Sequence, residues 1–247
     1  MTATETDTAR RQVWVTGVSR GLGLAIAARL LDEGHAVLGL GRRPGGFAAL
    51  AEAMPERAAF AEMDLSAPGA IGTIARDLLR IHGTPWGLVN NAAVGLDGVL
   101  ATQHQSDIER LIATNLTGPI TLTKFVCRAM LARSEGRIVN ISSIIASTGF
   151  HGLSVYAASK AGLEGFTRSL ARELGKRGVT ANCVAPGYME TEMTAGLAGG
   201  RLEQIRRRAP LGLAAPEDAA AAVAYLIGPG GAKVTGTVLT VDGGSTA

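Results

Sequence analysis

Short apolar runs alternate with longer segments of helical periodicity along the 247-residue chain, and this alternation constrains the fold more than any other feature. The apolar runs are almost continuously hydrophobic and are bounded by Gly or polar residues. Such runs are typical of strands that are buried on both faces of a parallel sheet. We find no internal repeat and no low-complexity linker, so the pattern extends over the chain as one unit.

The pattern yields seven strands and five helices. The expected strands are residues 12–16, 36–40, 58–62, 86–89, 137–141, 180–184 and 237–241. The expected helices are residues 21–33, 70–81, 106–133, 154–176 and 216–227. Strands that alternate with helices predict an α/β fold, here a single-domain, Rossmann-type, doubly wound parallel sheet of about seven strands with helices on both faces. Ligands of such a fold bind at the carboxyl ends of the strands.

Two segments depart from this pattern. Residues 1–11 are polar and lack the apolar stretch of a signal peptide, so we expect a flexible N-terminal tail before one domain at residues 12–247. Residues 186–215 are rich in Gly and Ala, and a loop of that length inside a compact domain is usually functional. We expect residues 187–215 to form a lid with a short helix over the site. The alternative is an ordinary surface excursion.

Composition excludes several classes of protein. The chain is 47% hydrophobic and 18% charged, which excludes disorder as a description of the whole. Its net charge of +3 is mild and the basic residues are scattered without interleaved aromatics, so we expect no nucleic-acid partner. Polar residues break the longest uncharged run, at 138–159, which argues against a membrane span. The His, Cys and carboxylate spacings suggest no metal site, and we expect a cytoplasmic protein with free thiols.

A glycine-rich turn follows the first expected strand. Gly17, Gly21 and Gly23 would let the backbone approach a pyrophosphate at the start of the next helix. No carboxylate stands at the end of the second strand, where an acidic residue would bind the ribose of NAD. Arg42 stands there instead, and with Arg20 it would pair with the 2′-phosphate of NADP. The alternative is that Arg42 and Arg43 are merely solvated.

Tyr156 precedes Lys160 by four residues in a segment expected to be helical. Residues four apart lie on one helix face, so the ammonium would lie beside the phenol and could change its acidity. Only three Tyr occur in the chain, so the spacing is suggestive of a catalytic pair.

These features together resemble the short-chain dehydrogenase/reductase family from residue 12 to the C-terminus. The motifs that carry the resemblance are Thr16-Gly-Val-Ser-Arg-Gly-Leu-Gly23, Asn90-Asn-Ala-Ala93, Asn115, Ser142-Ser143, Val155-Tyr-Ala-Ala-Ser-Lys160, Pro186-Gly187 and Val241-Asp-Gly-Gly244. Ala93 departs from the pattern, because the family usually has Gly there. The departure costs little if the backbone can keep its turn.

The resemblance implies an NADP(H)-dependent oxidoreductase with Asn115, Ser143, Tyr156 and Lys160 as catalytic residues. Tyr156 would be the acid/base, and Lys160, with the charge of the oxidised cofactor, would lower its pKa while bonding the nicotinamide ribose. Ser143 would donate a hydrogen bond to the substrate carbonyl. Asn115, in a local helix distortion, would hold a water linking Lys160 to solvent. The residues expected to bind the cofactor are Gly17, Ser19, Arg20, Gly21, Leu22, Gly23, Arg42, Asp64, Leu65, Asn91, Ala92, Tyr156, Lys160, Pro186, Gly187, Met189 and Thr191.

Within this family the chain is most similar to the 3-oxoacyl-(acyl-carrier-protein) reductases of fatty acid synthesis. This implies NADPH-dependent reduction of a 3-oxoacyl thioester. Two alternatives stay open: a ketoreductase or secondary alcohol dehydrogenase acting on a steroid, polyketide or other non-thioester ketone, and a non-catalytic dinucleotide-binding regulator. The expected substrate pocket is mostly apolar and consists of Ile144, Ile145, Phe150, Leu153, Tyr188, Met189, Met193 and Leu197.

Several basic residues are candidates for contacts with a partner or substrate. Arg177 matches a residue that the family uses to dock an acyl carrier protein, and Arg133 lies one place from a second. Both could equally be helix-end charges that complement the helix dipole. Arg206–Arg208 in the expected lid form a further basic patch. His151 either touches the substrate or is an ordinary rim residue.

The resemblance also implies a homotetramer, built by packing the long fourth and fifth helices and the C-terminal strand edge. Ala161, Gly162 and Gly165 in the helix at 154–176 are small enough for close helix packing.

Overall fold

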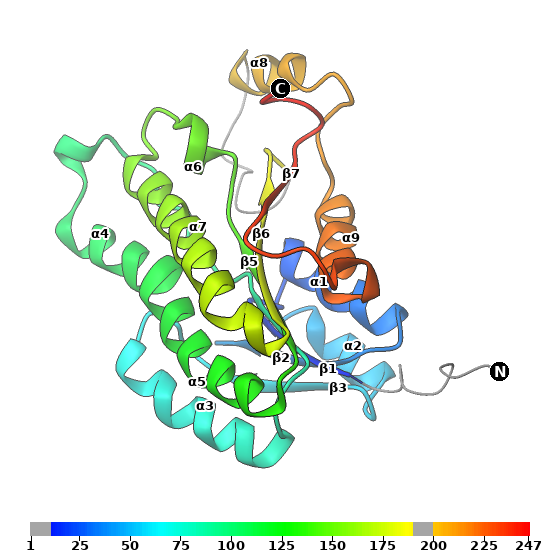
Figure 1. Ribbon diagram of the computed structural model, residues 1–247. Coiled ribbons are helices and arrows are strands. Elements are labelled where there is room, and N and C mark those ends of the chain that lie inside the picture. The colour runs from blue at the N-terminus through cyan, green and yellow to red at the C-terminus, as the bar shows by residue number, and fades with distance from the viewer. Residues whose placement is uncertain (1–10, 190–199) are drawn as a thin grey trace.

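The computed structural model describes residues 11–189 and 200–247, which form a parallel sheet flanked by helices (Figure 1). The sheet has seven strands in the order β3-β2-β1-β4-β5-β6-β7, and every neighbouring pair is parallel. The strands are β1 Gln12–Thr16, β2 Ala36–Gly41, β3 Ala58–Glu62, β4 Gly87–Asn90, β5 Gly136–Ile141, β6 Val179–Pro186 and β7 Val238–Val241. Strand order reverses between β1 and β4, so a crevice for ligands is expected at their carboxyl ends.

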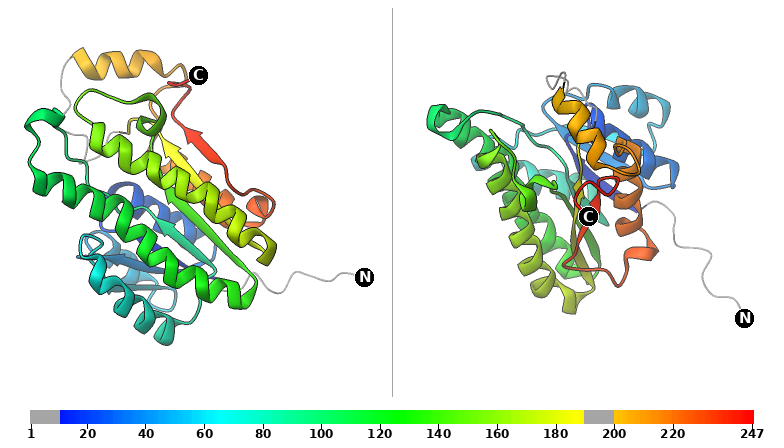
Figure 2. Two further views of the ribbon diagram at one scale, coloured as in Figure 1. Left: turned by 60° about the vertical axis from the view of Figure 1, so that its left-hand side comes forward. Right: turned by 90° about the horizontal axis from the view of Figure 1, so that it is seen from above.

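Helices cover both faces of the sheet, as Figures 1 and 2 show. One face carries α1 Gly21–Asp32, α2 Phe47–Ala53 and α9 Pro216–Ile227. The other carries α3 Pro68–His82, α4 Gln105–Ile112, α5 Gly118–Arg133 and α7 Ser154–Leu174. The expected fold class is therefore confirmed.

Strands β1 to β6 each contribute to two hydrophobic cores. Val13 and Val15 of β1 pack into the core shared with α1, α2 and α9, whereas Trp14 between them packs into the core shared with α3, α5 and α7. All three side chains are fully buried. Successive residues of a strand point to opposite faces, so a sheet covered on both sides requires the continuous apolar runs seen in the sequence.

The predicted strands all form, and their ends differ from the prediction by no more than two residues. The single helix expected at residues 106–133 is wrong: α4 and α5 are separated by a π-helical turn at Ala113–Thr117. This turn contains Asn115, so the expected local helix distortion is confirmed. Two helices were not predicted, α2 and the short α6 Ile145–Thr148.

The expected lid contains a helix, α8 Gly200–Arg208, which lies above the carboxyl-terminal edge of the sheet (Figure 1). Residues 1–10 of the expected tail lie outside the described residues, as do Thr191, Met193 and Leu197. Within the described part of the chain, no helix is long and apolar enough to cross a membrane. The same part contains no group of three His, Cys, Asp or Glu residues that could hold a metal ion.

Candidate active site

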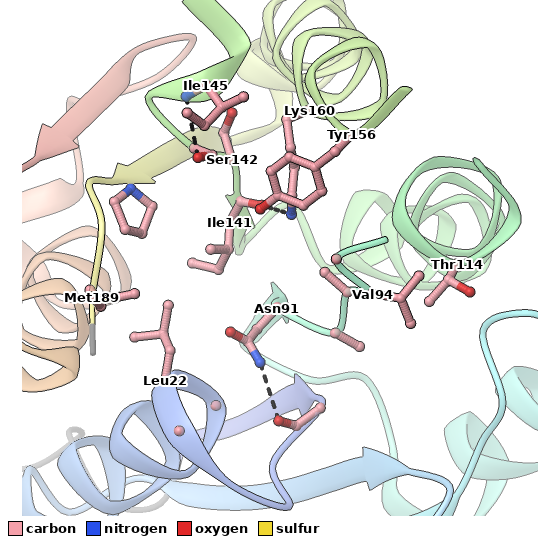
Figure 3. A pocket seen from close by; sticks show the side chains of 18 of the residues that line it. Leu22, Asn91, Val94, Thr114, Ile141, Ser142, Ile145, Tyr156, Lys160 and Met189 are labelled. Atoms are coloured by element: carbon pink, nitrogen blue, oxygen red, sulfur yellow. Dashed lines mark hydrogen bonds between the residues drawn. The ribbon is translucent and has the colours of Figure 1, made fainter. Parts of the chain in front are cut away.

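A cavity of about 1320 Å³ lies at the carboxyl ends of the strands (Figure 3). It receives side chains from the turn after β1, the ends of β4, β5 and β6, and the start of α7. All the residues expected to bind the cofactor line it, except Thr191, which lies outside the described residues. Of the four expected catalytic residues, Ser143, Tyr156 and Lys160 line the cavity and Asn115 does not.

The glycine-rich turn has the close packing that a phosphate site requires. Gly17 adopts a φ of +74°, and a Cβ there would lie 2.8 Å from the Cα of Ala92. A Cβ at Gly23 would collide with the carbonyl oxygen of Gly17. Helix α1 begins after Arg20 without a side-chain cap and without an acidic residue in its first turn. Its first N–H groups are therefore open to an anion, so the turn fits a dinucleotide pyrophosphate.

Thr16 and Asn91 hold the glycine-rich turn against the loop after β4. The buried hydroxyl of Thr16 accepts hydrogen bonds from the backbone N–H of Asn91 at 2.9 Å and of Ala92 at 3.0 Å. The Asn91 side chain donates in return to the carbonyls of Thr16 at 2.9 Å and Gly17 at 3.2 Å (Figure 3). Asn91 was predicted from the sequence as a cofactor-binding residue, but the role of the Thr16 hydroxyl was not, because its partners lie about 75 residues away in the chain.

Ala93 keeps the backbone of this loop without Gly. Among the described residues, Ser134 is the only one other than Gly with a positive φ. The departure from the family pattern at position 93 therefore requires no strained backbone.

At the end of the cavity where the adenosine of the cofactor is expected, one carboxylate, Asp64, lies near two cations. Burial acts to raise the pKa of Asp64, but hydrogen bonds from the side chain and backbone of Ser66, with Arg42 and Arg110 nearby, outweigh it and lower the pKa. The two bonds from Ser66 measure 2.7 and 2.8 Å. Arg42 and Arg110 both line the cavity. Arg110, on α4, was not predicted.

The hydroxyl of Thr114 is another feature that was not predicted from the sequence. Thr114 lines the cavity, and its buried Oγ1 has no hydrogen-bond partner among the described residues. A buried hydroxyl without a partner is costly unless a ligand or water satisfies it. The orphaned hydroxyl therefore fits a polar ligand at this wall.

Tyr156 and Lys160 project from one face of α7 into the cavity (Figure 3). The Lys160 Nζ donates a 2.7 Å hydrogen bond to the carbonyl of Ile141, at the end of β5, and lies 5.6 Å from the Tyr156 ring centroid. Lys160 is only 3% exposed, and burial lowers its pKa to about 8. The expected adjacency of the two side chains is thus present.

Ser143, which follows β5, lies beside Tyr156, and the polar influence of its hydroxyl acts to lower the pKa of the phenol. Burial raises the pKa of Tyr156 by more, so the net shift is upward. Lys160 is not among the groups that lower the pKa of Tyr156 in the chain alone, and the lowering expected with the oxidised cofactor stays a prediction. The phenol is protonated at neutral pH.

Asn115 lies behind the cavity wall. Its side chain accepts a 2.8 Å hydrogen bond from the N–H of Val94 and donates a 2.9 Å bond to the carbonyl of the same residue. A longer bond of 3.5 Å reaches the hydroxyl of Ser159 on α7. Asn115 thus fixes the loop at Val94, which lines the cavity, to the helix that carries Tyr156 and Lys160.

Ser142 also links β5 to α7, a contact that the sequence analysis missed. Its hydroxyl donates a 2.7 Å bond to a carboxylate oxygen of Glu164, whose other oxygen lies 3.9 Å from Arg168. Glu164 lies one helical turn after Lys160. The contact holds the end of β5, next to Ser143, against α7.

The substrate side of the cavity is mostly apolar. Ile144, Ile145, Phe150, Leu153, Tyr188 and Met189 line it as expected. His151 lines it too, which agrees with either interpretation of that residue.

Arg133 and Arg177 lie far from this cavity within one chain. They occupy the segments just before β5 and β6, at the edge of the sheet opposite to the carboxyl ends. Arg133 lies 3.2 Å from Glu135, and Arg177 donates a 3.1 Å bond to the carbonyl of Leu131 near the end of α5. The bond from Arg177 satisfies a helix-terminal carbonyl, as the helix-end interpretation requires.

A crevice with this glycine-rich turn and this Ser, Tyr and Lys arrangement defines a class of dinucleotide-dependent oxidoreductases. The family model for short chain dehydrogenase matches residues 11–201, and the chain belongs to this family.

Its relatives include the 3-oxoacyl-(acyl-carrier-protein) reductases FabG of Vibrio harveyi, 38% identical, and of Escherichia coli K12, 37% identical, each over 231 residues. Both alignments cover 93% of this chain and 95% of the relative. A similar solved structure is a gluconate 5-dehydrogenase from Burkholderia cenocepacia in complex with NADP and tartrate, with a TM-score of 0.91, 28% identity and 96% of each chain covered.

Proposed function

We propose that the protein is a cytoplasmic, NADPH-dependent reductase that converts a 3-oxoacyl thioester, carried by acyl carrier protein or coenzyme A, into the 3-hydroxyacyl thioester. The observation that carries the proposal is a protonated Tyr156, beside Ser143 and Lys160, in a cavity with an apolar wall. An apolar wall suits an acyl chain, and the similarity to FabG reductases over 93% of the chain supports the same substrate class.

The preference for NADPH is argued from the end of β2. Arg42 follows this strand and lines the cavity, where a carboxylate would bind the ribose hydroxyls of NAD. A guanidinium can form paired hydrogen bonds with a 2′-phosphate. Bound NADPH supplies the hydride for the substrate carbonyl carbon, and the related Burkholderia structure contains NADP.

Residues of the chain donate the proton and stabilise the charge that develops on the carbonyl oxygen of the substrate. Tyr156 donates its proton to the carbonyl oxygen, because its raised pKa keeps the phenol protonated at neutral pH. Ser143 donates a hydrogen bond to the same oxygen and so stabilises the charge that develops there. Lys160, with a pKa of about 8, forms a hydrogen bond with the nicotinamide ribose and is part of the path by which a proton reaches Tyr156 from solvent. Asn115 positions the loop at Val94 and α7 for this chemistry, and the water expected beside it is part of the proposal.

Carrier-protein docking through Arg133 and Arg177 remains part of the proposal. Both side chains are exposed, and the six residues of β5 alone separate their edge of the sheet from the cavity edge by about 20 Å. A carrier bound there would therefore serve the cavity of another subunit, which links this docking site to the proposed homotetramer.

The small residues of α7 differ in their availability for subunit contacts. A Cβ at Gly162 would lie 3.1 Å from a methyl carbon of Leu116 in the same chain, so Gly162 serves packing within the subunit. Gly165 has open space around it, and Ala161 is exposed. A tetramer contact through α7 would therefore use Gly165 and Ala161.

A second candidate function is reduction of a non-thioester ketone. The similarity to a gluconate 5-dehydrogenase, with a TM-score of 0.91, favours it, because the same Ser, Tyr and Lys arrangement can act on a polar hydroxy or oxo acid. The regulator without turnover is disfavoured, because all four expected catalytic residues are present.

The test is NADPH oxidation with acetoacetyl-CoA and longer 3-oxoacyl thioesters, beside 5-ketogluconate and several bulky neutral ketones. Turnover with thioesters at the highest kcat/KM supports the proposed function. Turnover confined to ketones or to the sugar acid supports the second candidate. Tyr156→Phe is the control in each assay, and activity retained in that variant would contradict the mechanism for either substrate.

A further inference from the structure

The three consecutive arginines at the end of α8 have different surroundings. Arg207 lies 3.5 Å from the carboxylate of Glu203, one turn earlier in the helix, and does not line the cavity. Arg208 does line the cavity, and within the described part of the chain its guanidinium takes part in no hydrogen bond or ion pair. An exposed cation that faces a binding cavity without a partner is available to a ligand.

Arg208 and His151 meet at the mouth of the cavity. A smaller adjoining space of about 150 Å³ is lined by Phe150, His151, Gln204, Ile205 and Arg208. All of these except Gln204 also line the large cavity. Two segments, the connection before α7 and the helix α8, therefore present one cation and one imidazole beside apolar side chains at the same opening.

The carboxylates of the cavity do not neutralise Arg208. The described ones are Asp64, Asp97 and Asp242. Asp64 is bonded to Ser66, and Asp242 accepts four hydrogen bonds from the C-terminal turn, which leaves only Asp97. Asp97 forms no ion pair with Arg208.

The cofactor end of the cavity has its own cations. Arg42 and Arg110 lie beside Asp64, at the adenosine end. Arg208 instead lies on the side of Phe150 and His151, which precede the catalytic Tyr156. An anion bound by Arg208 would therefore belong to the substrate.

We propose that Arg208, with His151 beside it, recognises an anionic group of the substrate at the mouth of the cavity. A guanidinium forms paired, charge-assisted hydrogen bonds with a phosphate or a carboxylate, and an imidazole N–H can add a third bond. The group is the phosphate of a pantetheine arm if the substrate is a thioester, and this identity rests on the proposed function. It is the carboxylate of a free oxo acid if the second candidate holds.

The experiment measures binding by calorimetry to the full-length protein loaded with NADP⁺. One pair of probes is pantetheine 4′-phosphate and pantetheine, and the other is D-gluconate and D-sorbitol. Each pair differs mainly by the anionic group. The variants are Arg208→Gln and His151→Ala, with Arg207→Gln as the matched control, because it removes the same charge from the same helix without changing the cavity lining. Thermal unfolding of each variant checks that it is folded.

In the wild-type protein and in Arg207→Gln, the anionic probe of one pair should bind about tenfold more tightly than its neutral partner. A difference of this size is what a modest charged hydrogen bond at an exposed site contributes. The difference should be lost in Arg208→Gln, reduced in His151→Ala, and weakened by added salt. A difference in the pantetheine pair identifies phosphate, and one in the gluconate pair identifies carboxylate. The proposal is overturned if neither anionic probe binds better than its partner, or if the difference survives in Arg208→Gln.

Acetoacetyl-CoA turnover, measured on the same preparations, separates this result from the proposed function. A wild-type protein that discriminates the anionic probe but reduces no thioester refutes the proposed function and leaves the anion site standing. A wild-type protein that reduces thioesters but binds neither anionic probe more tightly than its neutral partner refutes the anion site and leaves the proposed function standing.

Discussion

Replacing Thr16 by Val tests whether the bonds between two loops hold the cofactor crevice in shape. Val has nearly the shape of Thr but lacks the hydroxyl, so the N–H groups of Asn91 and Ala92 would lose their acceptor. Each unsatisfied buried donor lowers the free energy of unfolding by about 1–3 kcal/mol. Because Asn91 and Ala92 are only half-buried, we expect the two donors together to cost about 2 kcal/mol. For a chain of this size, a loss of this free energy lowers Tm by roughly 4–8 °C.

The assay is thermal unfolding with and without NADPH, combined with a fluorescence titration of NADPH. Thr16→Val should also bind NADPH more weakly, because Asn91 and Ala92 line the crevice. Thr16→Ser is the matched control: it keeps the hydroxyl and loses one methyl, which costs about 1 kcal/mol or less. If Thr16→Val is as stable as Thr16→Ser, or binds NADPH as tightly as the wild type, the hydroxyl does not hold the loops together and the reasoning is wrong.

Further predictions concern catalysis, cofactor choice, pH dependence and assembly. Tyr156→Phe should abolish NADPH oxidation while the fluorescence titration still shows NADPH binding; weakened binding would mean that the phenol shapes the crevice. Arg42→Gln should lower kcat/KM for NADPH by about tenfold or more and leave that for NADH within about twofold, whereas equal losses for both would exclude a contact with the 2′-phosphate. Burial lowers the pKa of Lys160 from 10.5 to about 8, so the unfolded chain binds more protons at this residue between these values, and its contribution to the free energy of unfolding should rise with pH there by up to about 3 kcal/mol. Burial raises the pKa of Cys183 from 9.0 to about 11, which acts in the opposite sense above pH 9, so the readout is the difference between the wild type and Lys160→Met. Urea unfolding at several pH values should show this difference growing in favour of the wild type as the pH rises, and a constant difference would place the titration elsewhere. Light scattering should give the mass of four chains, and a dominant monomer would remove the tetramer.

The sheet could be predicted because its requirements are local. A strand buried on both faces needs an apolar residue at nearly every position, as Val13, Trp14 and Val15 show, and the sequence displays this directly. The missed helix α2 covers only seven residues, too few for a helical period to stand out. The break between α4 and α5 was predicted only as a distortion near Asn115, although Gly118 and Pro119 directly follow the π-helical turn. Pro119 has no N–H to donate to the carbonyl of Asn115, so one continuous helix through this point was the wrong prediction.

The site was predictable in part for a related reason. Parallel strands end at one edge, so the topology alone brings the turn after β1 together with the start of α7, and Tyr156 and Lys160 are four residues apart. The contacts that fix these groups join distant segments, such as the bonds from Thr16 across to the loop at Asn91 and from Ser142 to Glu164. Neither the hydrophobic periodicity of the sequence nor the spacing of its residues indicates such pairs.

Substrate identity is encoded less directly than the chemistry. In the proposed mechanism Ser143, Tyr156 and Lys160 act only on a carbonyl and on the atoms next to it, so this mechanism is compatible with an acyl thioester, a ketone or a sugar acid alike. The discriminating contacts must therefore come from the parts of the cavity that meet the rest of the substrate. There the described walls offer apolar side chains such as Phe150 and Leu153, which favour an acyl chain, and one cation without a partner, Arg208, which favours an anion. An acyl thioester of pantetheine phosphate carries both features in one molecule, whereas a neutral ketone lacks the anion and a sugar acid lacks the apolar chain.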